Sequence, residues 1–218
     1  MPLMRVIALC LLLLLPRLGE AAVLFSQPPV DGGAAYYADR RDIEPAIPLA
    51  DDFTFSTYTS LTELRWWGAP NLGPQPVDDF LIEFYEGPLS SHALPFYSFT
   101  TPAVRSPTAL HEETGLVVYE YHFALPVTFT LHPGTYYVGI RNKGGSQNEW
   151  FWQIANGASF WIDPQGPFSG ESWQQQAGTP GLSFEIYGVP EPSETLCVGA
   201  ALMLLALVVT RGRILGTR

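Results

Sequence analysis

The chain has 218 residues, among them 21 Asp and Glu against 11 Lys and Arg, which gives a net charge of −10 at pH 7. Residues 22–188 are more acidic still, with a net charge of −12, so nucleic acid and anionic membrane surfaces repel them and we expect no nucleic-acid partner. Both cysteines lie outside this stretch, which therefore has no disulfide and no thiol chemistry. Its 167 residues suffice for one domain with a core of its own and are marginal for two.

Residues 1–21 have the three parts of a secretory signal peptide. Arg5 supplies the positive charge, residues 6–15 form the apolar part, and Gly19 and Ala21 are the small residues that a signal peptidase requires. An apolar run of about ten residues is too short to span a bilayer, so we expect no permanent N-terminal anchor. We therefore predict export, with cleavage by signal peptidase after Ala21.

Residues 22–188 have the pattern of short strands rather than of helices. Apolar residues do not recur at helical spacing for more than one turn, whereas runs of Phe, Tyr, Val, Ile and Thr recur between clusters of Gly and Pro. Phe80, Ile82 and Phe84 alternate with other residues, as expected for a strand with one buried face. The predicted strands are 23–26, 52–55, 61–67, 80–86, 95–100, 116–123, 127–131, 135–142, 150–155, 159–163 and 182–187.

The loops between these runs combine Gly, Pro and Asn or Asp, which supply the backbone angles that chain reversals require. The clearest examples are residues 68–76, 132–134 and 163–170. We therefore predict an all-β fold, an antiparallel β-sandwich of jelly-roll type with about nine to eleven strands. This domain occupies residues 22–188, between the N-terminal signal peptide and a C-terminal transmembrane helix.

The last thirty residues, 189–218, combine a proline motif, an apolar run and a basic tail. Two prolines in the motif fix φ and remove two backbone donors, so we expect an extended, exposed spacer that joins no sheet. Residues 195–210 carry no charge and would form about 24 Å of helix against roughly 30 Å of bilayer hydrocarbon. The motif, residues 189–193, consists of Val189, Pro190, Glu191, Pro192 and Ser193.

The basic tail, residues 211–218, directly follows the predicted transmembrane helix. It contains Arg211, Arg213 and Arg218 and no acidic residue. Snorkelling of the first two arginines and local thinning of the bilayer can cover the shortfall in helix length, and arginines after an apolar segment favour the cytoplasmic side. We therefore expect a membrane-anchored protein whose β-sandwich domain lies on the outside.

The order of proline motif, apolar segment and basic end resembles the PEP-CTERM sorting signal. In that family the signal is processed by an exosortase, a membrane-embedded peptidase of bacteria that make extracellular polysaccharide. The resemblance implies that this chain is an exosortase substrate, anchored before processing and then located in the cell envelope or outside the cell. A plain C-terminal anchor that no peptidase cuts is the alternative, because Pro-Glu-Pro is common in linkers.

A second resemblance concerns the central domain. The segments Asp51-Asp52-Phe53-Thr54, Leu64-Arg65-Trp66-Trp67-Gly68 and Phe184-Glu185-Ile186-Tyr187-Gly188 are similar to parts of a β-sandwich ectodomain that is frequent among PEP-CTERM proteins. The resemblance implies the architecture of the domain and its export, and it implies no particular activity.

The sequence contains no catalytic motif such as Gly-x-Ser-x-Gly, His-Glu-x-x-His or a Walker loop. Two pairings of functional groups remain as alternatives. His111 and His122 could hold a metal with Glu112 or Glu120, although strand geometry favours separate, solvated histidines. Glu83 and Glu120 could form the acid pair of a glycosidase, although both have the pattern of exposed residues on half-buried strands.

Two pairs of neighbouring aspartates precede predicted strands: Asp51 with Asp52, and Asp78 with Asp79. Neighbours within a strand point to opposite faces, so such a pair acts together only if it lies in a loop. Calcium takes six to eight oxygen ligands, which would have to come from several loops. A structural calcium site built from these four aspartates is the alternative to our expectation of no metal and no cofactor.

Six tryptophans are the most informative aromatic residues of the chain. The adjacent pair in strand 61–67 must face opposite ways, whereas Trp150 and Trp152 must face the same way. We expect four of the six in the core. Trp161 and Trp173 flank a loop and form a candidate ligand surface, because the apolar faces of sugars stack on such rings.

These observations predict a non-catalytic, exported protein of the bacterial envelope or extracellular matrix. Its expected partners are signal peptidase and exosortase during export, the membrane, and extracellular polysaccharide, with which the domain would associate. The alternative is a secreted, polysaccharide-active hydrolase whose acid pair the sequence does not reveal.

Overall fold

The computed structural model describes residues 21–38, 48–71, 78–89, 93–143, 149–157, 159–162 and 173–190. These residues form thirteen β-strands and no helix, which confirms the predicted all-β class. None of the described segments is therefore an apolar helix of the length that crossing a bilayer requires. Residues 1–20 of the predicted signal peptide lie outside the described residues, as do Glu191, Pro192, Ser193, the predicted helix 195–210 and the arginines 211, 213 and 218.

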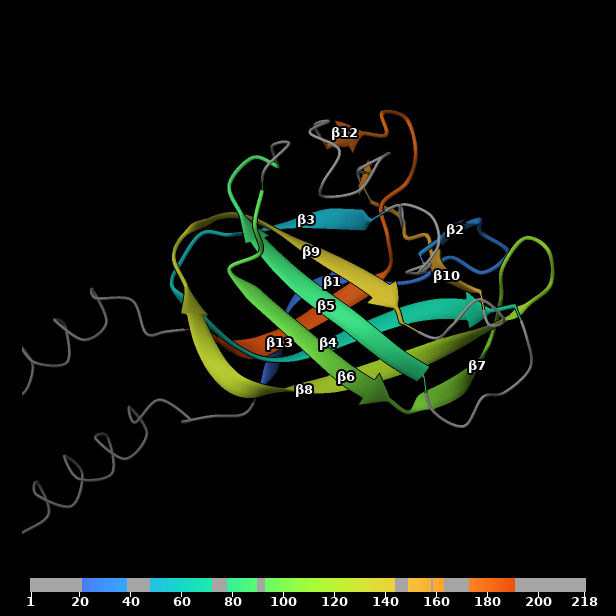
Figure 1. Cartoon of the computed structure of the whole chain (residues 1–218), viewed down its shortest axis with the longest axis horizontal. Coiled ribbons are helices and arrows are strands. Elements are labelled where there is room, and N and C mark those ends of the chain that lie inside the picture. The colour runs from blue at the N-terminus through green and yellow to red at the C-terminus, as the bar shows by residue number, and fades with distance from the viewer. Residues whose placement is uncertain are drawn as a thin grey trace, which may run out of the picture.

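The strands form two antiparallel sheets that face each other (Figure 1). The first sheet has seven strands, with β4 at its centre. On one side of β4 lies β13, followed by β1 at the edge of the sheet. On the same side, past the end of β13, β4 pairs with β10, which in turn pairs with β2. On the other side of β4 lies β8, followed by β7. Their bounds are β1 (Ala22–Gln27), β2 (Ala35–Tyr37), β4 (Thr59–Pro70), β7 (Arg105–His111), β8 (Val117–Leu131), β10 (Trp150–Gln153) and β13 (Phe184–Pro190).

The second sheet has six strands, and the chain enters it from the first sheet several times, for example between β8 and β9. Figure 1 shows β5, β6 and β9 in front of β4, β8 and β13, with β3 next to β9 at the top of the view. The strand order is β12 (Gln174–Gln175), β11 (Trp161–Ile162), β3 (Leu49–Phe55), β9 (Gly134–Asn142), β5 (Asp78–Glu86) and β6 (Tyr97–Ala103).

One large apolar core lies between the two sheets. Phe80, Ile82 and Phe84 of β5 are buried in it, as their alternation predicted. From the first sheet, Trp66 stacks on Tyr121 with ring centroids 5.6 Å apart, and Phe80 of the second sheet packs edge-on against Trp66 at 5.1 Å. Full burial of one Phe side chain stabilises a fold by roughly 1.5–3 kcal/mol, so this aromatic packing can hold together a domain without disulfides.

Trp67 is buried although it faces away from this core. It is 6% exposed and belongs to the outer face of the first sheet. The ladder between β4 and β10 ends at the pair Gly68↔Trp152, and Ser183 then lies between Trp67 and Gln153: the N–H of Trp67 donates to the Ser183 carbonyl at 3.4 Å, and the N–H of Ser183 donates to the Gln153 carbonyl at 2.8 Å. Gln153 donates to the carbonyl oxygens of Val30 and Gly33 at 2.9 and 3.1 Å, so the stretch between β1 and β2 lies over this part of the sheet. The three tryptophans that face the core are Trp66, Trp150 and Trp152.

β8 is one long strand where the sequence predicted two, 116–123 and 127–131. Pro126 does not end the strand, because the register shifts between the pairs Glu63↔Ala124 and Leu61↔Phe129 and the residues between them form a bulge. Three further strands, β2, β7 and β12, were not predicted from the sequence. All three lie at sheet edges, and their short or irregular sequences lack a clear apolar alternation.

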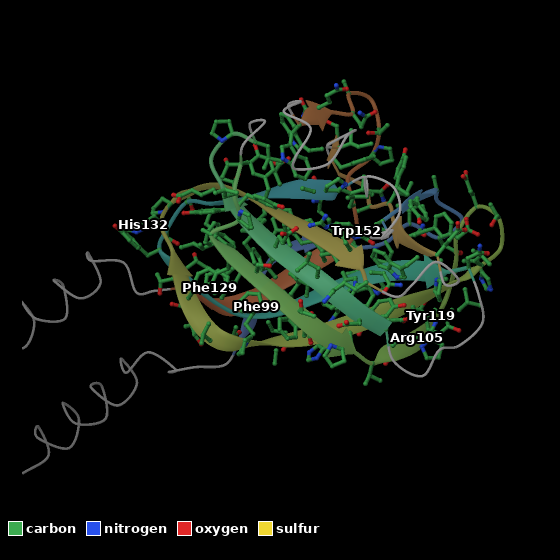
Figure 2. All side chains as sticks on the ribbon, in the orientation of Figure 1. Phe99, Arg105, Tyr119, Phe129, His132 and Trp152 are labelled. Carbon is green, nitrogen blue, oxygen red and sulfur yellow. The ribbon has the colours of Figure 1, made fainter. Side chains whose placement is uncertain are left out.

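A buried ion pair joins the two sheets near the start of β5. Arg105 of β7 lies with Nε 3.4 Å from Oδ2 of Asp78, and the two side chains are 5% and 1% exposed. The Tyr121 hydroxyl donates to the same oxygen at 2.9 Å. Burial and the Asp78 carboxylate raise the pKa of Tyr121, so its hydroxyl remains a donor. The Arg105 guanidinium also lies over the ring of Tyr119, 5.1 Å from its centroid (Figure 2).

β13 extends two residues beyond the predicted end of the domain at Gly188 and includes Val189 and Pro190 of the proline motif. Val189 pairs with Ser60, and Pro190 pairs with Thr59, so the prediction that this part of the motif joins no sheet is wrong. Proline is tolerated here because it is the last residue of the strand, where the ladder to β1 has already ended at Gly188.

Replacing Arg105 with Met should destabilise the protein by about 3–5 kcal/mol, because the Asp78 carboxylate then stays buried without a positive partner. The matched control is Lys143→Met, which removes a more exposed pair with Asp79 at 3.9 Å and should cost at most about 1 kcal/mol. Urea unfolding followed by tryptophan fluorescence measures both changes. Equal losses in the two variants would contradict a structural role for the buried pair.

Candidate functional site

The structure has a pocket at the end of the sheets where β8 continues into β9 and β5 leads to β6. Its volume is about 390 Å³. Near this end the chain turns at Gly87, whose φ of 72° is readily adopted only by glycine. We call it the end pocket; Figure 2 labels two of its residues, Phe129 and His132. The lining residues are Glu86, Phe96, Tyr97, Thr128, Phe129, Thr130, Leu131, His132 and Tyr136.

Aromatic side chains form much of the end pocket. Phe129 and Tyr136 are buried, whereas Phe96 and Tyr97 are each 37% exposed. Tyr97 stacks on Phe129 with ring centroids 4.3 Å apart and an interplanar angle of 30°, and Phe96 packs edge-on against Tyr136 at 5.9 Å. The two half-exposed rings are therefore held by buried rings and keep part of their apolar surface free.

Polar groups surround this apolar surface. Glu86, Thr128 and His132 are exposed, and the Tyr136 hydroxyl donates to the His132 carbonyl at 3.1 Å. Burial, with the Glu86 charge adding to it, raises the pKa of Tyr136, so this hydroxyl stays neutral. The His132 ring lies edge-on to Tyr58 at 4.9 Å. Half-exposed aromatic rings beside a carboxylate and a hydroxyl suit the apolar face and the hydroxyl groups of a sugar.

Phe96 and Tyr97 were not among the site residues predicted from the sequence. The signal was present in Leu94-Pro95-Phe96-Tyr97, because two adjacent aromatic residues at the start of a strand cannot both point to one core. Phe96 directly precedes β6, and Tyr97 begins it. Both rings therefore lie at the margin of the core, where each is only partly covered.

The predicted ligand surface of Trp161 and Trp173 lies in a second apolar cluster, on the outer face of the second sheet. Trp173 is 8% exposed and packs edge-on against Tyr85 at 5.7 Å. Trp161 is half-buried and packs edge-on against Tyr137 at 5.9 Å. Because Trp173 is nearly covered, it offers little ring surface to a ligand; the loop 163–172 between the two tryptophans lies outside the described residues.

The structure does not bring the four candidate calcium ligands together. Asp51 pairs with Val138, whereas Phe80, which follows Asp78 by two residues, pairs with Asn142. The two aspartate pairs are thus about six residues apart along β9, which is roughly 20 Å at 3.3 Å per residue. Within the described part of the chain there is no group of three or more side chains that could hold a metal ion.

Asp51 instead connects β3 with the first sheet. It is 1% exposed, and its Oδ2 accepts the backbone N–H of Leu182 at 2.6 Å and the side-chain amide of Gln27 at 3.3 Å. Gln27 ends β1, and Leu182 lies just before β13, so this carboxylate links the two sheets. Burial raises the pKa of Asp51 to about 7, although hydrogen bonds from Leu182 and Asp52 act in the opposite direction.

Glu83 and Glu120, the candidate acid pair, lie on the outer faces of different sheets. Glu83 of β5 contacts Arg141, and Glu120 of β8 contacts Arg65 at 3.6 Å. Two carboxylates on opposite outer faces cannot flank one glycosidic bond, so this pairing is wrong.

The candidate metal site of His111 and His122 is not formed either. His111 pairs with Val117, and His122 lies five residues further along β8, which is roughly 17 Å. Glu112 accepts hydrogen bonds from the backbone N–H groups of Thr114 and Leu116 and so stabilises the turn between β7 and β8.

Arg65 gathers three carboxylates on the outer face of the first sheet. Its guanidinium lies 3.6 Å from Glu120, 3.8 Å from Glu185 and 4.0 Å from Glu63. Nε2 of His122 lies 2.6 Å from Glu63 in the same group. One cation is thus shared by three anions, and this cluster lies apart from the end pocket, none of whose lining residues belongs to it.

The fold and the pocket define the class of protein: an acidic, all-β protein with two antiparallel sheets and an aromatic pocket at one end of them. No family model matches the chain, and neither a curated protein nor a solved structure matches it.

The variant Asp51→Asn should change the pH dependence of stability. The pKa of Asp51 is about 7 in the folded protein against an ordinary value of 3.8, so the folded state binds this proton more tightly than the unfolded state. The resulting stabilisation is complete below about pH 4 and is lost as the pH rises to about 7.

Urea unfolding at several pH values should therefore show that the free energy of unfolding of wild type falls by up to about 4 kcal/mol relative to that of the variant between pH 4 and pH 7. This value corresponds to about 1.4 kcal/mol for each unit of the shift in pKa. Both proteins keep the neighbouring Asp52, so the effect of its titration on stability cancels when wild type and variant are compared at the same pH. A difference between the two proteins that does not change with pH would contradict this assignment.

Proposed function

We propose that this protein is a non-catalytic, exported component of the bacterial envelope or extracellular matrix that binds neutral glycan in its end pocket. The half-exposed rings of Phe96 and Tyr97 carry this proposal. Aromatic rings of this kind provide an apolar surface for a sugar ring, while Glu86 and Thr128 at the same pocket can bond to its hydroxyls. The net charge of −12 for residues 22–188 favours neutral over acidic polysaccharides.

The proposal includes sorting by an exosortase through the motif Val189–Ser193 and a β-sandwich of jelly-roll type for the domain. The sequence order of motif, apolar segment and basic tail supports the first part. The geometry is compatible with it, since Ala22 pairs with Gly188 and both ends of the described body therefore lie together. β1 also begins at the residue that follows the expected signal-peptidase cleavage site.

A secreted polysaccharide hydrolase is the second candidate function, and the carboxylates around Arg65 are the observation that favours it. A glycosidase needs two carboxyl groups on either side of the bond that it cleaves. Glu63, Glu120 and Glu185 are close together, yet all three engage the same guanidinium. In the end pocket, Glu86 is the one carboxylate among the lining residues, so the pocket favours binding over hydrolysis.

The variants Phe96→Ala and Tyr97→Ala should each weaken glycan binding about tenfold, since each removes about 1.4 kcal/mol of contact with the sugar. The matched control is Val104→Ala, at a side chain that is 71% exposed at the opposite end of the sheets. Affinity electrophoresis in gels containing laminarin or galactomannan measures retention, and acidic alginate should not retain the protein. Equal retention of all three variants would contradict a site at the end pocket.

Substituting Pro190, Glu191 and Pro192 with alanine should leave the unprocessed precursor in the membrane fraction of the native host. The reason is that an exosortase would no longer recognise its motif, while the apolar segment 195–210 stays intact. Immunoblots of membrane and secreted fractions measure the precursor, and Glu194→Ala, just outside the motif, is the control. Normal processing of the triple variant would remove the sorting part of the proposal.

A further inference from the structure

Exposed apolar side chains gather at the end of the body that carries the end pocket. Seven large hydrophobic side chains are exposed among the described residues, and Val104, at the opposite end, is one of them. Leu94 is 85% exposed, just before Phe96 and Tyr97 at the start of β6. The set at the pocket end, which we call the apolar rim, is Tyr58, Leu94, Phe96, Tyr97 and Val127.

The chain leaves the body at this same end. Thr59 pairs with Leu131, a residue of the end pocket, on one side and with Pro190, the last residue of β13, on the other. Tyr58, which precedes Thr59, contacts His132 at 4.9 Å. The apolar rim and the exit of the chain toward residues 191–218 are therefore neighbours.

The length of the following chain limits how far this end can be from a membrane. The uncharged run begins at Thr195, and the five steps from Pro190 to Thr195 reach at most about 18 Å when fully extended. If residues 195–210 span a bilayer, the end of the body must lie within that distance of its surface. The apolar rim then faces lipid head groups at close range.

We propose that in the anchored precursor the apolar rim rests on the interface of a neutral or zwitterionic lipid bilayer. This inference depends on the membrane anchor of the proposed function. The transfer of Leu and Phe side chains from water into the lipid interface is favourable in free energy, and Tyr side chains prefer the level of the head groups. The tether keeps the rim near the surface, so even weak contacts become populated. Glu86 and the net charge of −12 disfavour anionic lipid, which restricts the contact to uncharged head groups.

Contact of the apolar rim with lipid would also cover part of the end pocket. Phe96 and Tyr97 belong both to the apolar rim and to the pocket lining. A ring that lies in the lipid interface cannot stack on a sugar at the same time, so the anchored form binds glycan less well. Release of the body from the tail would then free the pocket at the moment the protein reaches the matrix.

The experiment uses residues 22–218, the anchored precursor expected after signal-peptide cleavage, in phosphatidylcholine vesicles, with Cys197 replaced by serine. A nitrobenzoxadiazole probe is attached at Leu94→Cys, and the matched control carries it at Val104→Cys, an exposed apolar position at the opposite end. Doxyl-labelled lipid should quench the probe at position 94 several-fold more than the probe at position 104. Phosphatidylglycerol in the vesicles should reduce this difference.

Three results would overturn the inference, and they can be told apart. If the chain does not float with the vesicles, the anchor of the proposed function fails, and the membrane contact of the rim fails with it. If the chain floats and the probes at positions 94 and 104 are quenched equally, the anchor stands and the contact of the rim with lipid is wrong. Protection of position 94 by a second copy, with no quenching by lipid, would likewise overturn it.

Discussion

The inward-facing aromatic side chains are the constraint on which the rest of the structure depends. The body between its two cysteines has no disulfide, so the sheets must be held by packing. Trp66, Tyr121 and Phe80 provide this by interlocking stacked and edge-on rings from both sheets. Because large rings fill the space between the sheets, the residues at the margins of this core remain partly uncovered, and the end pocket is formed from them.

Buried carboxylates complete the connection between the sheets. Each predicted pair of aspartates contributes one inward-facing member, because strand alternation sends the second member outward. Asp51 binds backbone and side-chain donors near β1 and β13, and Asp78 pairs with Arg105. Asp51 and Asp78, two of the four aspartates that suggested a cation site in the sequence, therefore stabilise the junction of the two sheets through contacts with protein groups.

The two ends of the body differ in chemistry. One end has the Asp78–Arg105 pair, whose charges are buried. The other has the end pocket and the apolar rim, next to the point where β13 ends. An exported protein whose body is tethered at that end would present one surface to two partners in turn, first to lipid and later to glycan. The same exposed rings of Phe96 and Tyr97 serve both proposals.

The sequence by itself determined the all-β class and most of the strands, because strand alternation and turn residues are local properties of the chain. Phe80, Ile82 and Phe84 are inside for this reason, and Trp66 and Trp67 face opposite ways. The pairing of strands that are distant in the sequence decided the extent of the strands and which side chains lie together. It merged two predicted strands into β8, drew Pro190 into β13, separated Glu83 from Glu120, and covered Trp173. Only the tertiary structure brings Phe96 and Tyr97 together with Phe129 and His132, since the pocket depends on which strand ends meet in space.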